Sequence, residues 1–184
     1  RLALRSMKQA RYSPDNDGHF GLATQYYTHF TSPIRRYPDL QIHRIIKDNL
    51  RGRMNDAKRH HYEKILPEVA METSSLERRA DEAERETLKL KKVQYMRNFF
   101  GQEFEGVISG ITKWGIYVEL PNTVEGLIHI NTLRDDYYVF DQDAYELRGD
   151  ITGKIFRLGQ KVRVRVADAD KMLKTVDFVL VEED

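Results

Sequence analysis

One segment gathers side chains that bind phosphate. The run YTHFTSPIRRYPDL, residues 27–40, places Arg35 and Arg36 in succession. The pattern predicts a helix with Ser32 as its N-cap and Pro33 in its first turn, where the N–H that proline lacks would have no partner anyway. The two guanidinium groups would then lie beside free backbone N–H groups, which attract anions. Because a guanidinium can hold two phosphate oxygens at once, the segment predicts phosphate binding.

Aromatic side chains flank the two arginines. Tyr27, His29 and Tyr37 offer flat faces on which RNA bases could stack. The alternative is a capped helix whose arginines pair with Asp39 and with solvent. Capped basic helices are common, so on spacing alone the structural alternative is the stronger of the two.

The charge of the chain is distributed unevenly. The net charge is +1 overall, but residues 1–66 hold 13 Lys and Arg against 6 Asp and Glu, a net of +7. Residues 101–184 hold 10 Lys and Arg against 16 Asp and Glu, a net of −6. A basic half indicates an anionic partner, although chance sorting of surface charges would give the same asymmetry.

Composition excludes several classes of protein. The 184 residues include no cysteine, which rules out disulfides, thiolate zinc sites and cysteine nucleophiles and suits a cytoplasmic protein. No apolar run reaches the length of a membrane span, so no membrane partner is expected. The chain opens at Arg1 in a stretch that looks helical over residues 1–10, without a signal peptide, and is interpreted as a fragment of a longer protein.

Helices are predicted for much of the first hundred residues. Pro38 should kink or restart the first of them before Leu40–Leu50, since proline cannot donate a helix hydrogen bond. A long helix is predicted over Glu68–Phe100, ended by Gly101. One face of it would carry small side chains that allow close approach of another helix or of a substrate; this face comprises Leu76, Ala80, Ala83, Thr87 and Leu90.

After Gly101 the hydrophobic pattern alternates as in β-strands. Five short strands in about eighty residues are typical of a small closed barrel, and the OB fold is the commonest five-stranded kind. An acidic, tyrosine-rich insert separates the third strand from the fourth. The predicted strands are residues 104–111, 114–120, 124–130, 161–167 and 175–181, and the insert is residues 131–159.

The run GHFGLATQYYTHFTSPIRRYPDLQIHR, residues 18–44, resembles the signature near the end of the catalytic domain in the ribonuclease II and ribonuclease R family. LERRADEAERE, residues 76–86, is similar to the family's next helix. DDYYVFDQ, residues 135–142, and RLGQKVRVRV, residues 157–166, are similar to the bacterial ribonuclease R branch. The resemblance covers essentially the whole chain.

This resemblance implies an α+β fold in two domains. Residues 1–100 would be the helical C-terminal end of an RNB-type catalytic domain. Residues 101–184 would be a five-stranded OB-fold barrel of the S-one type, the RNA-binding module named after a ribosomal protein.

The resemblance also implies an enzyme that hydrolyses RNA processively from the 3′ end and releases nucleoside 5′-monophosphates. Its partner would be single-stranded RNA with a free 3′ end, and it would act as a monomer. The family holds magnesium with a cluster of Asp residues, and nothing in this sequence matches that cluster. Asp15 and Asp17 have the character of loop formers. We therefore expect the ligands to belong to the parent enzyme and this chain alone to be inactive.

The family's catalytic roles can be transferred to two positions here. Arg35 matches the arginine that contacts the phosphate at the reacting end, and Arg36 follows as a second basic candidate beside Tyr37 and His29. Glu84, on the small-residue face of the long helix, matches an active-site Glu of the family. The equally weighted alternative for Glu84 is an ordinary solvated helix charge.

The predicted barrel resembles the S-one module in three side chains that form a stacking platform for bases. These are Trp114 at a strand start, Tyr117 on the same strand, and His129 on the adjacent strand. Stacking of this kind contributes about 1–3 kcal/mol per base and tolerates any sequence. The alternative is that the two aromatic residues belong to the barrel core.

Two further features of the barrel could contact phosphates. In KVRVRV, alternation places Lys161, Arg163 and Arg165 on one face and three valines on the other. The family's remaining pair of RNA-contacting residues, an acid and a base four residues apart, falls on Asp170 and Lys174. Solvated turn charges are an equally simple explanation of that pair.

Three classes of function are compatible with these features. An exoribonuclease leads, and a non-catalytic single-stranded RNA-binding protein is the alternative, because such barrels occur in many binding proteins. An interaction scaffold built on the long charged helix has the least support. The SPIRRYPD run, residues 32–39, favours the enzyme, since a binding module has no need of it.

Overall fold

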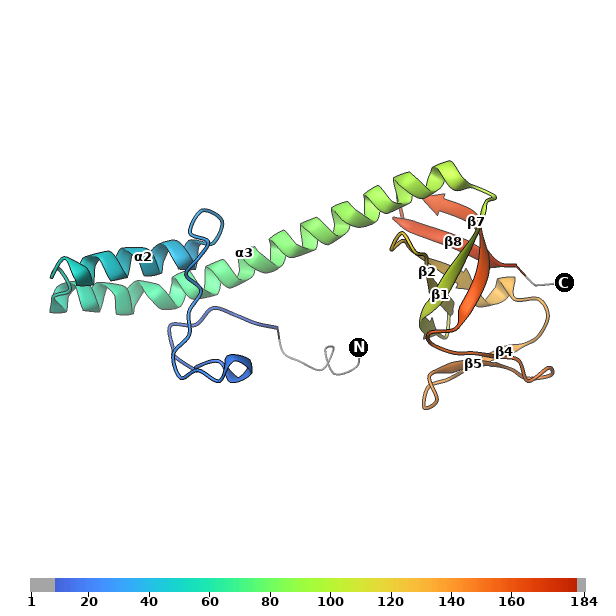
Figure 1. The fold of residues 1–184 in the computed structure, drawn as a ribbon, viewed down its shortest axis with the longest axis horizontal. Coiled ribbons are helices and arrows are strands. Elements are labelled where there is room, and N and C mark those ends of the chain that lie inside the picture. The colour runs from blue at the N-terminus through green and yellow to red at the C-terminus, as the bar shows by residue number, and fades with distance from the viewer. Residues whose placement is uncertain (1–8, 182–184) are drawn as a thin grey trace. The chain divides into compact units, whose positions relative to one another are not determined.

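The computed structural model describes residues 9–181 (Figure 1). These residues form two compact units, which divide between residues 83 and 84. Most of the helix predicted over residues 1–10 lies outside the described residues, and residues 9 and 10 are irregular. None of the helices in the described range is both long enough and apolar enough to cross a membrane.

The first unit is built from helices and an extended loop. After the short 3₁₀ helix η1 (Phe20–Leu22), the chain runs through exposed residues into α2 (Tyr37–Leu50). Helix α3 (Asp56–Met96) begins earlier and ends sooner than predicted, and it continues through Pro67. The two helices lie side by side (Figure 1), and the Asp48 carboxylate accepts hydrogen bonds from Lys58 Nζ at 2.6 Å and the Tyr62 hydroxyl at 2.8 Å.

The predicted helix start at Ser32 and Pro33 is wrong. Residues 33–35 form a turn, in which the N–H groups of Arg35 and Arg36 donate to the Ser32 carbonyl at 3.2 and 2.9 Å. A helix starting there would carry Pro38 in its interior, where the ring clashes and a hydrogen bond is lost. The chain instead extends at Arg36, and α2 starts with Pro38 in its first turn, where proline is tolerated. The predicted restart is therefore confirmed.

The five-stranded barrel of the second unit is confirmed. Its closed sheet has the order β1-β2-β3-β8-β7, with β3 and β8 parallel and every other neighbouring pair antiparallel. The end of α3 contributes Val93 and Met96 to the same apolar core, and Gly101 follows in a left-handed conformation. The strands are β1 (Glu103–Thr112), β2 (Gly115–Glu119), β3 (Glu125–His129), β7 (Lys161–Asp170) and β8 (Thr175–Leu180).

The insert between β3 and β7 contains a second sheet that the sequence pattern did not predict. Its three strands are β4 (Tyr138–Asp141), β5 (Glu146–Gly149) and β6 (Ile155–Phe156), paired in that order. Tyr138, Leu147 and Phe156 join the barrel's core cluster. The strands are too short for alternation to be visible, and acidic turn residues surround them.

Candidate RNA-binding surfaces

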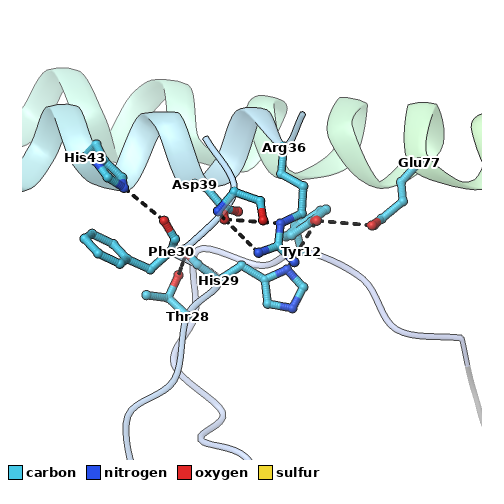
Figure 2. Close-up of polar contacts among 9 residues, drawn as sticks. Tyr12, Thr28, His29, Phe30, Arg36, Asp39, His43 and Glu77 are labelled. Atoms are coloured by element: carbon cyan, nitrogen blue, oxygen red, sulfur yellow. Dashed lines mark hydrogen bonds and ion pairs between the residues drawn. The ribbon is translucent and has the colours of Figure 1, made fainter. Parts of the chain in front are cut away.

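The two adjacent arginines have opposite environments. Arg36 donates from Nε at 3.1 Å and from Nη2 at 2.8 Å to one carboxylate oxygen, Oδ2 of Asp39. Its side chain is only 17% exposed, and that of Asp39 is 0% exposed. The structural alternative from the sequence, arginine pairing with Asp39, is therefore true of Arg36 (Figure 2).

The same oxygen of Asp39 also accepts the backbone N–H of Ser32 at 2.8 Å. Burial acts to raise the pKa of Asp39, but the hydrogen bonds from Ser32 and Arg36 outweigh it and lower that pKa below its usual value. Asp39 thereby closes residues 32–39 into a compact loop, which we call the arginine turn.

Arg35 lies inside the arginine turn and is exposed to solvent. Among the described residues, no ion pair or side-chain hydrogen bond engages its guanidinium. The turn thus locks one guanidinium and presents the other. A fixed backbone carrying an unengaged guanidinium is suited to holding an anion.

Aromatic and histidine side chains surround the arginine turn. The Tyr12 hydroxyl contacts His29 Nδ1 at 3.4 Å and donates to Glu77 Oε1 at 3.3 Å (Figure 2). Phe30 stacks on His43 with ring centroids 4.3 Å apart, and His43 Nε2 lies 2.9 Å from the Phe30 carbonyl oxygen. The His29 ring also lies edge-to-face with the rings of Tyr12 and Tyr27, with centroids 5.6 and 5.9 Å apart.

Tyr37 lies at the start of α2 and is about half exposed. The Arg44 guanidinium lies 5.9 Å from the centre of its ring and within 3.5 Å of its hydroxyl. A base stacking on this ring would have to use the face that Arg44 leaves open. The prediction that Tyr37 binds RNA remains a prediction.

Glu84 is exposed on α3 and belongs to the second unit, whereas Arg35 belongs to the first. The two predicted catalytic residues therefore fall in separate units. The role of Glu84 remains a prediction.

The proposed stacking platform lies on the outer face of the barrel. Gly115 pairs with His129 and Tyr117 pairs with Leu127 across β2 and β3, so Tyr117 and His129 share a face. Trp114 precedes β2, is 58% exposed, and has Lys113 Nζ 4.9 Å from its ring. The core alternative is wrong for these aromatic residues, because the inward positions of β2 belong to Ile116 and Val118.

The barrel face beyond the platform is acidic. Leu127 pairs with Asp177 across the parallel strands β3 and β8, and Asp168 is the partner of Asp177 on β7. Partial burial and then the nearby Asp168 carboxylate raise the pKa of Asp177, while His129 lowers it. Phosphates are expected to avoid this side of the platform.

The cationic stripe has the predicted alternation. Lys161, Arg163 and Arg165 are exposed, whereas Val164 and Val166 are buried. Arg163 Nε lies 3.1 Å from a Glu103 carboxylate oxygen on the neighbouring strand. At least one cation of the stripe is therefore partly neutralised within the barrel.

Asp170 and Lys174 both have structural partners. The Asp170 carboxylate accepts the N–H groups of Met172 and Leu173 at 2.6 and 3.0 Å, which shapes the turn between β7 and β8. Lys174 Nζ lies 2.5 Å from Glu86 Oε2 on α3, and this hydrogen bond and that from Lys89 lower the pKa of Glu86. Neither Asp170 nor Lys174 is therefore merely a solvated charge of the turn.

Tyr117 and Lys174 meet in a groove of about 420 Å³ between the end of α3 and the barrel. The α3 side of this groove carries Lys89 and Lys92, and Lys92 Nζ reaches the Thr123 carbonyl at 2.5 Å. We call this the lysine groove. The sequence analysis missed both lysines, although the basic run KLKK at residues 89–92 was a visible signal.

Nothing in the part of the chain that the structure describes supports metal binding. Within residues 9–181, no group of three or more His, Asp or Glu side chains could hold a metal ion. The described residues therefore do not fit a magnesium site.

Comparison with known protein families finds one domain match within each of the two compact units. Residues 1–52 match the RNB domain, and residues 98–179 match the S1 RNA binding domain, the S-one module. The first match contains the arginine turn, and the second contains the stacking platform and the cationic stripe. Glu84 lies in neither, and the predicted boundary at residue 100 remains a prediction.

Relatives match along the whole chain. Ribonuclease R of Thermotoga maritima is 49% identical over 187 residues, which are 100% of this chain and 26% of that protein. Ribonuclease R of Escherichia coli is 44% identical over 192 residues, 100% of this chain and 24% of that protein. The apo form of Mycoplasma genitalium RNase R is similar in structure, with a TM-score of 0.88 at 32% identity, covering 98% of this chain and 28% of that one.

The chain therefore joins the end of an RNB domain to an S1 RNA-binding domain, which is the architecture of an RNA-processing protein. It belongs to the ribonuclease R family. It spans about a quarter of the length of the curated relatives it matches.

Proposed function

We propose that this chain is the RNA-holding end of a processive 3′-to-5′ exoribonuclease that releases nucleoside 5′-monophosphates. The substrate would be single-stranded RNA with a free 3′ end. The observation that carries the proposal is the arginine turn, in which Asp39 holds the Arg36 guanidinium while no described residue engages that of Arg35. The family supports it, and one similar structure is Mycoplasma genitalium RNase R in complex with ribose methylated single-stranded RNA.

The role of Arg35 in this proposal is to stabilise charge on the reacting phosphate. A guanidinium fixed before the reaction stabilises the transition state without reorganising during it. Arg36 then acts within the turn, not on RNA. Magnesium is the expected metal of the parent enzyme, with its Asp ligands outside residues 9–181. The parent would be a monomer in the cytoplasm.

The second unit would hold the strand behind the reacting end. Trp114, Tyr117 and His129 would stack bases, and Lys161, Arg163 and Arg165 would attract phosphates. The lysine groove supports a strand path beside Tyr117, because Tyr117 and three lysines line the same groove. Asp170 would act through the turn that it shapes.

Arg35 can be tested in the longer ribonuclease that carries this segment. Arg35→Ala should lower kcat by about 10²- to 10³-fold, the usual cost of one lost transition-state donor. Arg35→Lys should recover little, since a point charge does not reproduce the guanidinium fork. Single-turnover degradation of labelled single-stranded RNA measures this, and wild-type turnover in both variants would remove Arg35 from the site.

A second candidate function is RNA binding without catalysis by this chain. It is favoured by the lack of a metal-binding group among the described residues. The 184-residue chain, given magnesium and labelled single-stranded RNA, should bind the RNA and leave its length unchanged. Magnesium-dependent shortening from the 3′ end would show that a metal site exists within this chain.

A further inference from the structure

Asp39 is the most deeply buried charged residue of the first unit's described part, with 0% of its side chain exposed. A carboxylate is costly to remove from water unless hydrogen bonds replace its hydration. Here three donor groups converge on Oδ2: the Ser32 N–H, and Nε and Nη2 of Arg36. The two residues that supply these donors lie seven and three residues before Asp39, so the contacts act on one short loop.

These contacts fix the backbone on both sides of Arg35. Ser32 is tied to Asp39 through its N–H, and its carbonyl accepts the N–H groups of Arg35 and Arg36. Arg36 is tied to Asp39 through its side chain. The backbone of Arg35 therefore has little freedom, while its guanidinium is held by nothing in the described structure.

We propose that Asp39 is a positioning residue that aims Arg35 at the reacting phosphate and keeps Arg36 away from it. This inference rests on the proposed function of Arg35. Asp39 touches no substrate: it acts by fixing the turn and by neutralising the neighbouring guanidinium. Two adjacent free guanidinium groups would bind a phosphate at least as tightly, but in more than one geometry.

The consequence is a split between binding and turnover. Asp39→Ala removes a negative charge and frees Arg36, so the site becomes more basic and KM should stay level or fall. The Arg35 guanidinium is no longer held in position, and kcat should fall by about 10²-fold, since small misplacements at a reacting centre cost that much. A residue that only stabilised the fold would not produce this split.

Asp39→Asn separates geometry from charge. Oδ1 of Asp39 is buried and accepts no hydrogen bond from a described residue. An amide can therefore place its oxygen at the Oδ2 position, keep the contacts from Ser32 and Arg36, and turn its NH₂ toward the unused position. This conservative variant should lose less turnover than Asp39→Ala.

The decisive experiment is a double-mutant cycle in the longer ribonuclease, with kcat and KM measured on single-stranded RNA. If Asp39 acts through Arg35, Asp39→Ala should change kcat by less than about twofold when Arg35→Ala is already present. Asp48→Ala is the matched control, because Asp48 also holds two side chains of this unit but lies away from the arginine turn. It should leave kcat unchanged.

The outcomes separate the two proposals. If Arg35→Ala leaves kcat intact, the proposed function of Arg35 is wrong. Two results would overturn the positioning role alone, given that Arg35→Ala lowers kcat. One is that Asp39→Ala leaves kcat unchanged. The other is that the double variant loses kcat by the product of the two single losses, as independent sites would. Circular dichroism of each variant before the assay establishes that its fold is intact, and Asp39→Asn carries the test if Asp39→Ala does not fold.

Discussion

The arginine turn and the barrel are stabilised by different means. The turn, residues 32–39, depends on hydrogen bonds to one buried carboxylate, and Ile34 within it is fully exposed. The barrel depends on a closed ladder of strands around an apolar core, with Ile116 and Val164 fully buried. A site formed by few polar contacts can be broken by one substitution that leaves the fold intact, whereas the barrel's surface can change while its core keeps the shape.

The contrast also concerns the charges that each region offers to RNA. The turn pairs the Arg36 guanidinium with Asp39, and no described residue engages the guanidinium of Arg35. The barrel offers several cations, of which Arg163 and Lys174 share nearby carboxylates. The turn is thus suited to one defined contact, and the barrel to a diffuse attraction along a strand.

The largest effect is expected from truncating a buried side chain of the barrel core. The Phe178 side chain is 1% exposed and packs against Gly126, so Phe178→Ala should lower the free energy of unfolding by about 3–5 kcal/mol. Phe30→Ala, at a ring 44% exposed beside the arginine turn, should cost much less. Urea unfolding of the 184-residue chain measures both, and equal losses would contradict the contrast.

Base stacking on the barrel should come next in size. Trp114→Ala or Tyr117→Ala should weaken binding of a single-stranded oligonucleotide by about 1–3 kcal/mol and leave the salt dependence unchanged, because stacking releases few counterions. Tyr137→Ala, at another exposed ring of this unit, is the control.

Fluorescence titration suits this measurement, since the chain has a single tryptophan and its quenching reports directly on Trp114. Trp114→Ala itself is followed by anisotropy of a labelled oligonucleotide. Undiminished affinity in a folded Trp114→Ala variant would place the stacking surface elsewhere.

The two regions also differed in how far sequence could predict them. Alternation and glycine turns were enough for the five barrel strands, because a period of two directly reports which side chains face a core. The arginine turn was predicted as a helix, since Ser32 and Pro33 have the character of a helix start. The interruption at Pro38 was visible in the sequence and correctly predicted a restart. The hydrogen bond from the Ser32 N–H to Asp39 spans only seven residues, but a contact of this kind leaves no periodic pattern in the sequence.

The lysine groove escaped prediction for a related reason. Its lysines come from α3 and from the β7–β8 turn, and no spacing in the sequence joins the two. The family resemblance named Lys174 but gave no sign of its ion pair with Glu86.

A smaller effect is expected from the charges of this groove. Lys89→Ala should flatten the plot of log affinity against log salt by about 0.7 if the lysine meets one phosphate of a single strand. Glu86→Gln should instead raise affinity, because it releases Lys89 and Lys174 from a shared carboxylate. Titrations at several salt concentrations measure both, with Glu63→Gln in the first unit as control. An unchanged slope for Lys89→Ala would remove the groove from the RNA path.

The smallest effect concerns the insert. There, as in the arginine turn, one carboxylate accepts several hydrogen bonds and so holds a loop in place. The Asp136 carboxylate accepts the N–H groups of Tyr137, Ile151 and Thr152 and the Thr152 hydroxyl. Partial burial would raise the pKa of Asp136, but these hydrogen bonds outweigh it and lower that pKa from 3.8 to about 2.

A carboxylate whose pKa is lower in the folded state stabilises that state above its unfolded pKa and loses this contribution as the pH falls. For Asp136 the loss should occur between about pH 4 and pH 2, following the shift from 3.8 to about 2. The unfolding midpoint of Asp136→Asn should therefore lie below that of the wild-type chain at pH 7, with the gap closing over this interval. Asp143→Asn, an exposed acid of the same insert, gives the baseline for losing a charge. A difference in unfolding midpoint that stays constant down to pH 2 would mean that the charge of Asp136 does not stabilise the insert. The comparison of Asp136 with the carboxylate of the arginine turn would then be wrong.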